Sequence, residues 1–310
     1  MAKMRLALIA GGKSSEREVS LKSGAQVYEA LDKNKYDIRR YDPLTDLAKI
    51  VQDAPDLQAA LIIMHGRGGE DGTMQGFLDL LEIRYQGSGV LASALAMDKE
   101  LSKALYQMAG LRVPNAMAFC RDNAPTPEEI RAALGLPVVI KPATEGSSIG
   151  ISLARDLEEL QAGLAMAFHY DSQLLVEEFI QGTEVTGAVL GNRNPQALPL
   201  VEIIPAEHYN FFDYEAKYQP GASKEICPAR LSPELTVQAQ RCALKAHDAL
   251  GCRGYSRTDM IVQDDLIYVL ETNTIPGMTA TSLFPQAAKA AGLEFPALLD
   301  ELIRLALEKD

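Results

Sequence analysis

Short apolar runs alternate with amphipathic stretches along the first third of the chain. The apolar runs predict buried strands at residues 5–10, 36–41 and 59–64. Two stretches have helical spacing of apolar positions and predict helices at residues 15–33 and 73–82. Strands that alternate with helices favour a parallel sheet covered by helices. We therefore expect an N-terminal α/β domain over residues 1–96 with an open parallel sheet.

Local signals mark where the early helices begin and end. Ser15 and Glu18 have the spacing of a capping box, in which each side chain bonds the backbone of the other residue. Residues 97–109 have the pattern of one further helix, which leads through Gly110 and Pro114 into new structure. The sequence thus predicts a domain boundary close to this helix.

The rest of the chain has two further patterns. Residues 116–180 read as strand, helix, strand, glycine-rich turn, strand, helix and strand, which predicts a central domain over 97–182. A C-terminal domain is expected over 183–310, and two helices close the chain. This domain should contain a long aromatic and charged loop at residues 208–226 and an amphipathic helix at 233–250, which Ser232 caps. Two paired strands are expected at 254–262 and 266–272. Loops of that length and composition are typical of lids or binding elements.

Composition narrows the class of protein. The 310 residues are 47% apolar and carry a net charge of −12, so the protein should repel nucleic acid and anionic lipid. No signal peptide or transmembrane run is found. The four cysteines lack CxxC spacing and only four histidines occur, which argues against a zinc site or a disulfide framework. A reducing cytoplasm is the expected location.

A strand predicted at residues 136–142 contains Lys141 and runs directly into a loop of small residues at 143–150. Backbone N–H groups and serine hydroxyls in such a loop can approach phosphate oxygens. The loop is neither a Walker A motif nor a G-x-G-x-x-G fingerprint. A surface hairpin turn is the alternative interpretation, and the loop alone does not decide between the two.

Polar residues recur at alternate positions of the two paired strands near the C-terminus. Arg257 and Asp259 should share one face of the first strand, and Glu271 and Asn273 one face of the second. If the strands pair, three oxygen-bearing side chains converge in a way that suits magnesium. The alternative is a solvated face of the sheet.

Two glycine-rich turns follow strands of the predicted parallel sheet. The string HGRGGEDG at 65–72 includes His65, and Glu16 lies in the turn after the first strand. Ligands of α/β sheets bind at this carboxyl edge. A structural histidine and a dipole-favoured glutamate are the alternatives. Further on, Glu177, Glu178 and Glu184 could meet the ribose and adenine of a nucleotide, or could line a solvated turn.

Taken together, the motifs resemble the D-alanine–D-alanine ligases of the ATP-grasp superfamily. The matching strings occur in the family's order and cover nearly the whole chain: GGKSSEREVS (11–20), HGRGGEDG (65–72), GSGVLASALAMDK (87–99), KPATEGSSIG (141–150), FDYEAKY (212–218), EICPARL (225–231), SRTDM (256–260) and ETNTIPGMT (271–279). The resemblance implies a three-domain α/β fold, in which two α+β domains clasp ATP.

The resemblance also implies a role for individual residues. Those expected to bind ATP are Lys99, Lys141, Ser148, Glu177, Phe179, Ile180, Glu184 and Lys217. Those expected to hold two Mg²⁺ or Mn²⁺ ions are Asp259, Glu271 and Asn273. Those expected to surround two D-alanines or to act in catalysis are Glu16, His65, Ser147, Tyr218, Arg257, Gly277, Ser282 and Leu283. The family also implies a homodimer.

The activity implied is ATP-dependent ligation of two D-alanines for peptidoglycan precursor synthesis. Three alternatives stay open at this point. One is a sibling ligase that makes D-Ala-D-lactate or D-Ala-D-serine, and Tyr218 disfavours the lactate product. Another is an unrelated carboxylate–amine ligase on the same scaffold. The third is a non-catalytic nucleotide sensor, which should have lost the metal and phosphate residues that this chain retains.

Overall fold

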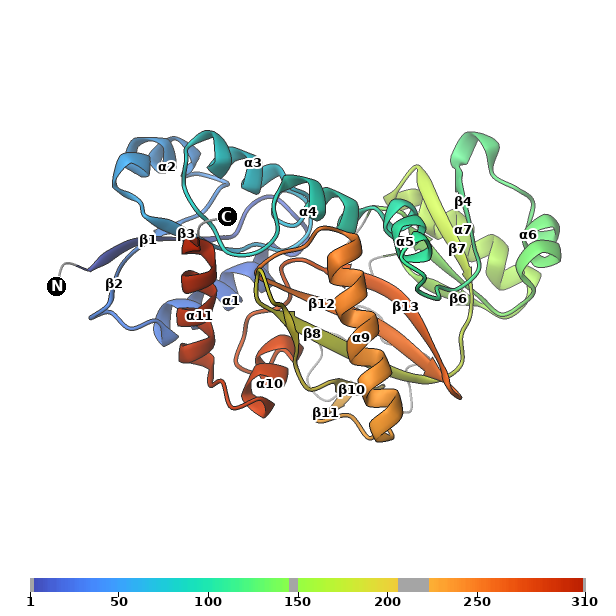
Figure 1. Cartoon of the computed structure of the whole chain (residues 1–310). Coiled ribbons are helices and arrows are strands. Elements are labelled where there is room, and N and C mark those ends of the chain that lie inside the picture. Colours follow the sequence, from blue (N-terminus) through green and yellow to red (C-terminus); the bar gives the residue numbers. More distant parts are fainter. Residues whose placement is uncertain (1–2, 145–149, 206–222, 309–310) are drawn as a thin grey trace.

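The computed structural model describes residues 3–144, 150–205 and 223–308. Three sheets lie along the molecule, numbered below in chain order, and the third lies between the first and the second (Figure 1). None of the helices in these ranges has both the length and the apolar character needed to cross a bilayer.

The first sheet has three parallel strands in the order β2-β1-β3. Every residue of β3 is buried, as expected for a strand covered on both faces. Its elements in chain order are β1 (Met4–Ala10), α1 (Arg17–Ala30), β2 (Tyr36–Tyr41), α2 (Leu47–Asp53), η1 (Ala54–Asp56), β3 (Ala59–Ile63), α3 (Thr73–Leu80) and α4 (Val90–Met97). The predicted parallel sheet is confirmed.

Two local predictions in this region are wrong. Helix α1 begins at Arg17 rather than Ser15, and its cap position, Glu16, makes no side-chain capping bond. With Glu16 as the cap residue, Ser15 lies before the cap and Glu18 at the second helical position, so the two do not have the positions of a capping box. The single helix expected at 97–109 is two helices, because Asp98 ends α4 and caps the next one by accepting from two backbone N–H groups.

The second sheet has four antiparallel strands in the order β4-β7-β5-β6, with α6 and α7 packed together beside it. The order of strands and helices along the chain matches the pattern predicted for residues 116–180. The elements are α5 (Lys99–Met108), β4 (Ala116–Cys120), η2 (Arg121–Asn123), α6 (Pro127–Leu134), β5 (Val138–Pro142), β6 (Ser152–Ala154), α7 (Leu157–Tyr170) and β7 (Gln173–Glu178).

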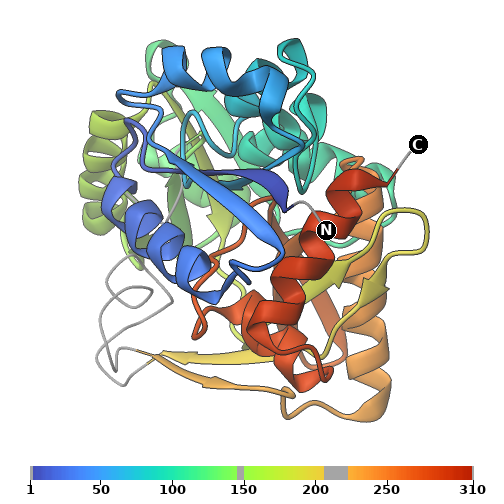
Figure 2. The ribbon, with the colours of Figure 1, turned by 90° about the vertical axis from the view of Figure 1, so that its left-hand side faces the viewer.

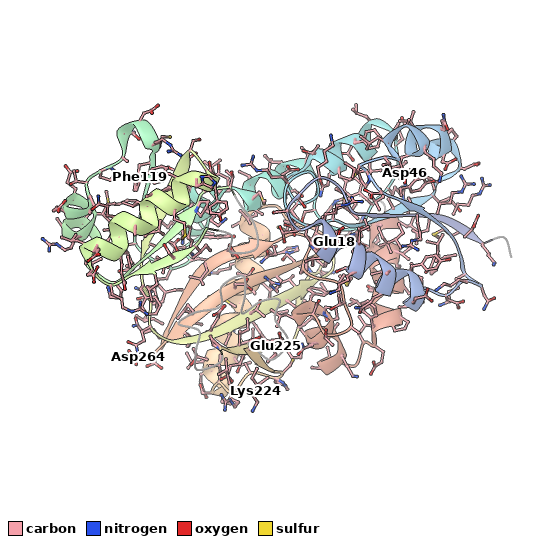
Figure 3. The ribbon with its side chains drawn as sticks, turned by 180° about the vertical axis from the view of Figure 1, so that it is seen from behind. Glu18, Asp46, Phe119, Lys224, Glu225 and Asp264 are labelled. Carbon is pink, nitrogen blue, oxygen red and sulfur yellow. The ribbon has the colours of Figure 1, made fainter. Side chains whose placement is uncertain are left out.

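The third sheet has six antiparallel strands, with β11-β10-β8-β12-β13 in order and β9 paired to β8. Helix α9 packs on β8, β12 and β13, and Ser232 caps it as predicted. Figure 3 shows Lys224 and Glu225 on the edge strand β11. The elements are β8 (Thr183–Leu190), β9 (Gln196–Ala197), β10 (Val201–Pro205), β11 (Ser223–Ile226), α9 (Pro233–Ala249), β12 (Tyr255–Gln263), β13 (Leu266–Asn273), α10 (Leu283–Ala290) and α11 (Phe295–Leu307).

The C-terminal helices pack back onto the first sheet. Helix α11 contacts β3, and Figure 2 shows it running beside the blue N-terminal strands. One apolar cluster therefore combines Leu8 and Leu61 of the first sheet with Phe284 and Leu302 of the last two helices. This shared core fixes the carboxyl edge of the parallel sheet against the third sheet. The proposed division at residues 96 and 182 stays a prediction.

Candidate active site

The turns that follow β1 and β3 meet at one edge because these strands are parallel neighbours. They bring Glu16 and His65 together, and both side chains are buried. The Nδ1 atom of His65 lies 3.5 Å from Glu70 Oε1, while its Nε2 is buried without a hydrogen-bond partner among the described residues. Burial lowers the pKa of His65, but the carboxylates of Glu70 and Glu16 outweigh it and raise that pKa above its usual value.

A cavity of about 480 Å³ opens beside this histidine. Elements from both ends of the chain line it, because α11 packs on β3 and α1, and α10 packs against α11. All six of the described residues expected around the two D-alanines line this one cavity: Glu16, His65, Arg257, Gly277, Ser282 and Leu283. The structure therefore brings together a set that is scattered from residue 16 to residue 283.

The N-terminus of α10 forms one wall of this cavity. Ser282 is its cap residue and Leu283 its first residue. Ser282 Oγ accepts from Thr279 N–H at 3.1 Å. A Cβ added at Gly277 would lie 3.1 Å from Ser282 Oγ, so the glycine keeps this wall open. A helix N-terminus and its backbone N–H groups favour an anionic group such as a carboxylate.

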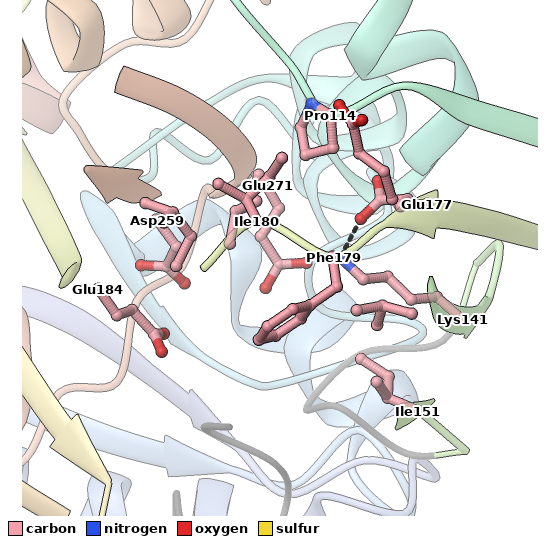
Figure 4. Close-up of a pocket in the computed structure, with 13 residues that line it drawn as sticks. Pro114, Lys141, Ile151, Glu177, Phe179, Ile180, Glu184, Asp259 and Glu271 are labelled. Atoms are coloured by element: carbon pink, nitrogen blue, oxygen red, sulfur yellow. Dashed lines mark ion pairs between the residues drawn. The ribbon is translucent and has the colours of Figure 1, made fainter. Parts of the chain in front are cut away.

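A second cavity, of about 110 Å³, lies between the second and third sheets (Figure 4). Its walls combine apolar side chains with acidic residues and one lysine. Of the residues expected to bind ATP or metal, those that line it are Lys141, Glu177, Phe179, Ile180, Glu184, Asp259 and Glu271. A nucleotide needs an apolar slot for its flat aromatic base and a charged end for its polyphosphate, and this cavity offers both.

Three charged side chains, two of them buried and one half-buried, meet at one side of the second cavity. Glu177 Oε2 lies 2.6 Å from Lys141 Nζ, and Glu177 Oε1 lies 2.5 Å from Lys103 Nζ in an ion pair without hydrogen-bond geometry. Burial raises the pKa of Glu177, but the two lysines outweigh it and hold that pKa below its usual range. Burial keeps the pKa of Lys103 low, whereas Glu177 and Glu271 raise that of Lys141.

The expected metal ligands lie on paired strands. Asp259 is directly opposite Glu271, and Arg257 is directly opposite Asn273. Asn273 Nδ2 lies 3.4 Å from Asp259 Oδ2. The predicted pairing of the two strands is confirmed, and it brings Asp259 close to Glu271 and Asn273, whereas their role as metal ligands stays a prediction.

The donor set fits a hard divalent cation, since two carboxylates and one amide oxygen leave positions for phosphate oxygens and water. Among the described residues, no group of three or more His, Cys, Asp and Glu side chains could hold a metal alone.

Arg257 and Asp259 connect the two cavities. Arg257 and Asn273 line the larger cavity, while Asp259 and Glu271 line the smaller one. Arg257 donates two hydrogen bonds to the Asp259 carboxylate, and Thr186 Oγ1 donates a third at 2.6 Å. The smaller cavity therefore lies next to the larger one, since residues only two positions apart on β12 line them.

Some expected residues are not placed in either cavity. Ser147, Ser148, Lys217 and Tyr218 lie outside the described residues. Lys99 is buried at the first position of α5 and lines neither cavity, although its backbone N–H donates to the carbonyl of Ala143 at 3.3 Å. Helix α5 thus begins beside the start of the predicted phosphate loop.

Sequence reasoning missed three residues near these cavities. Lys103 lies one helical turn after Lys99, and that spacing was the available signal. Thr186 offered no signal, because a threonine in a strand is ordinary. Glu225 lines the larger cavity, where burial raises its pKa and the contacts with Gln286 and Arg257 oppose that rise.

Comparison with known proteins agrees with this geometry. A family model described as the C-terminus of D-ala D-ala ligase matches residues 105–304, and one described as its N-terminus matches residues 5–46. The chain belongs to the D-alanine–D-alanine ligase family. A member of this family from Syntrophobacter fumaroxidans is 60% identical over 306 residues, which cover 99% of this chain and 98% of the relative.

Solved structures of family members have the same fold. The D-alanine–D-alanine ligase of Bacillus anthracis, crystallised in complex with ATP, is 36% identical, with a TM-score of 0.86 and coverage of 98% of this chain and 97% of the other. The VanG D-Ala:D-Ser ligase of Enterococcus faecalis is 34% identical, with a TM-score of 0.85 and coverage of 99% and 100%. The predicted ATP-grasp fold is therefore confirmed.

Proposed function

We propose that this chain is a ligase that uses ATP to join two molecules of D-alanine into D-alanyl-D-alanine for peptidoglycan precursor synthesis. The observation that carries the proposal is the pair of adjoining cavities, linked by Arg257 and Asp259. One cavity has the apolar slot and the lysine that a nucleotide needs, and the other has the charges that an amino acid needs. Family membership supports the same activity.

A carboxylate is a poor electrophile, so the first D-alanine must be activated. Its carboxylate oxygen attacks the γ-phosphorus of ATP, the bond to the β-phosphate oxygen breaks, and an acyl phosphate and ADP form. Lys141 places a positive charge at the phosphate end of the smaller cavity. Glu16 is proposed to hold the ammonium group of this D-alanine, and His65 to contact the same substrate through Nε2, which has no hydrogen-bond partner among the described residues.

The neutral amine of the second D-alanine then attacks the acyl carbon, and phosphate leaves. Arg257 and the backbone N–H of Gly277 are proposed to donate to the oxygen that becomes negative, which is worth about 10²–10³ in rate per donor. The N-terminus of α10, at Ser282 and Leu283, is proposed to hold the second carboxylate. Excluding water from the site protects the acyl phosphate.

The proposal includes two Mg²⁺ or Mn²⁺ ions, which Asp259, Glu271 and Asn273 would hold. When bound, they supply positive charge that offsets the charge of the phosphate oxygens. Ser148 and Lys217 are proposed to bind ATP beside Lys99, and Ser147 and Tyr218 to act with Glu16 in closing the site. These roles rest on the resemblance of the motifs. A homodimer and a cytoplasmic location are also proposed, and neither nucleic acid nor membrane is expected as a partner.

D-Serine as the second substrate is the one alternative that a specific observation favours, because the D-Ala:D-Ser ligase of E. faecalis is among the similar structures. Incubation with ATP, Mg²⁺ and either D-alanine alone or D-alanine with D-serine separates the two. We expect ADP, phosphate and mainly D-alanyl-D-alanine by mass spectrometry. Equal consumption of ATP with L-alanine would refute the substrate assignment, and a predominant D-alanyl-D-serine product would favour the alternative.

A further inference from the structure

We propose that Lys103 is a positioning residue, which serves as the permanent counter-ion of Glu177 and so allows Lys141 to leave that carboxylate for the nucleotide phosphates. The inference rests on the proposed function, in which Lys141 contacts the phosphates. In the part of the chain that the structure describes, Lys103 lines neither of the two cavities, so its proposed role is indirect.

The geometry places one carboxylate between two ammonium groups. Lys103 reaches Glu177 from α5, while Lys141 and Glu177 lie on the neighbouring strands β5 and β7. The side chains of Lys103 and Glu177 are only 7% and 2% exposed, so water cannot replace a lost partner. Lys141 and Glu177 line the cavity (Figure 4), whereas Lys103 is not among its lining residues. Two cations thus share one anion, and only one of them faces the ligand.

This excess of cations matters when a nucleotide binds. A buried carboxylate that loses its only partner is strongly destabilised. If Lys141 were that only partner, it could contact the phosphates only by leaving Glu177 uncompensated, and nucleotide binding would be weakened. With Lys103 in place, Glu177 keeps one ion pair in both states. Lys103 therefore lowers the cost of moving Lys141 without touching the nucleotide.

The alternative is that Lys103 only stabilises the packing of α5 on the second and third sheets. A double-mutant cycle with Glu177 separates the two roles, because a residue that acts through a carboxylate has no effect once the carboxylate is gone. Lys103→Met removes the charge and keeps an unbranched side chain. Glu177→Gln removes the negative charge and keeps the shape. Lys245, an exposed residue on α9, offers a matched lysine-to-methionine control.

The first measurement is the Kd for ADP by titration calorimetry on the full chain, without D-alanine. We expect Lys103→Met to weaken ADP binding by roughly ten- to a hundredfold, and Lys245→Met to leave it unchanged. In the Glu177→Gln background, adding Lys103→Met should change the Kd by less than about threefold. The double variant should also fold, because a buried ion pair replaced on both sides by neutral groups of similar shape leaves no uncompensated charge.

The second measurement is the steady-state rate as ATP is varied. Loss of a counter-ion that acts in both the ground and transition states should raise the KM for ATP and leave kcat nearly unchanged. Lys141→Met, in contrast, should lower kcat. The inference is overturned, and the proposed function is not, if Lys103→Met leaves the ADP affinity unchanged. The same holds if Lys103→Met weakens ADP binding by the same factor in the Glu177→Gln background as in the parent chain. If the parent chain fails to bind ADP, or Lys141→Met has no effect, the proposed function fails and the inference fails with it.

Discussion

Arg257 holds Asp259 by two parallel hydrogen bonds, with Nε 3.0 Å from Oδ1 and Nη2 2.8 Å from Oδ2. The two residues lie two positions apart on β12 and face the same side of the strand. Arg257 lines the larger cavity and Asp259 the smaller one. A cation held by Asp259 would compete with Arg257 for the same oxygens, so metal loading of the proposed site would change the partners of the proposed oxyanion donor.

The first prediction concerns the planar fork of Arg257. Arg257→Lys keeps the positive charge but cannot make the bidentate contact or the same donation into the larger cavity. We expect kcat to fall by about 10²–10³, with an unchanged melting temperature. Arg230→Lys serves as the control, since Arg230 makes a similar bidentate contact with Glu202 at the surface. Equal activity of the two variants would contradict the role of Arg257.

The second prediction concerns the hydroxyl that orients Asp259. Thr186→Val removes the 2.6 Å hydrogen bond from Thr186 Oγ1 to Asp259 Oδ1 and keeps the shape of the side chain. Partners that orient a metal ligand typically contribute about 10–100-fold to metal affinity. The Mg²⁺ concentration for half-maximal activity should rise by that factor. Thr183→Val, at the exposed start of the same strand, should leave it unchanged, and a similar shift in both would refute the idea.

The third prediction concerns Glu271, which lies opposite Asp259 on β13. Glu271→Gln removes a negative ligand from the proposed metal site, so turnover should fall by orders of magnitude. The fold should survive, because without metal the acidic side chains repel one another. Circular dichroism and the melting temperature check the fold, and Glu158→Gln on the exposed face of α7 is the control. Near-parental turnover at low Mg²⁺ would rule out a ligand role.

The fourth prediction concerns the pH dependence set by His65 and Glu70. The folded-state pKa of His65 is raised above 6.5, so its protonation stabilises the fold below that value, and this contribution is lost as the pH rises through the folded-state pKa. Glu70→Gln should lower the pKa of His65, as measured by NMR titration of its ring protons. The decrease in the free energy of unfolding that Glu70→Gln causes should be larger at about pH 6 than at about pH 9. An equal loss at both values would contradict the coupling.

The fifth prediction concerns His247, which shows the opposite behaviour. Its Nδ1 lies 2.7 Å from Ser256 Oγ, and its Nε2 is buried without a hydrogen-bond partner in the described structure. Burial lowers the pKa of His247 from 6.5 to about 4. Because the folded-state pKa is depressed, the unfolded chain takes up the proton first, and stability falls as the pH drops from the unfolded value toward the folded one.

The expected loss between these pH values is about 3 kcal/mol. Urea unfolding across this range measures it, and His247→Gln, which retains a partner for Ser256, should flatten this part of the curve. His169→Gln is the control, because that residue lies at the end of α7 away from this cluster. A parent chain whose stability is constant over the range would refute the prediction.

Much of the architecture is predictable from local sequence patterns. Short apolar runs predicted the strands of the first sheet, amphipathic spacing predicted the helix capped by Ser232, and alternate polar positions predicted the shared strand faces that carry Asp259 and Glu271. These predictions succeed because side chains two apart on a strand share a face, whatever lies elsewhere in the chain. The start of α1 was not predictable in this way. Ser15 and Glu18 have the right spacing, but the helix takes Glu16 as its cap residue, and that side chain is buried in the folded chain.

The sequence by itself determined the motifs, their order and the kinds of chemical group available at each strand end. Only the tertiary structure decided which of these groups share a low-dielectric site. Lys103 and Glu177 are far apart in the chain, and their ion pair depends on how α5 packs against β7. Arg257 likewise shares a cavity with Glu16 and His65 only because β12 and α10 pack against the first sheet. Desolvation and ion pairing depend on long-range packing, whereas helix and strand periodicity depend on neighbours in the chain.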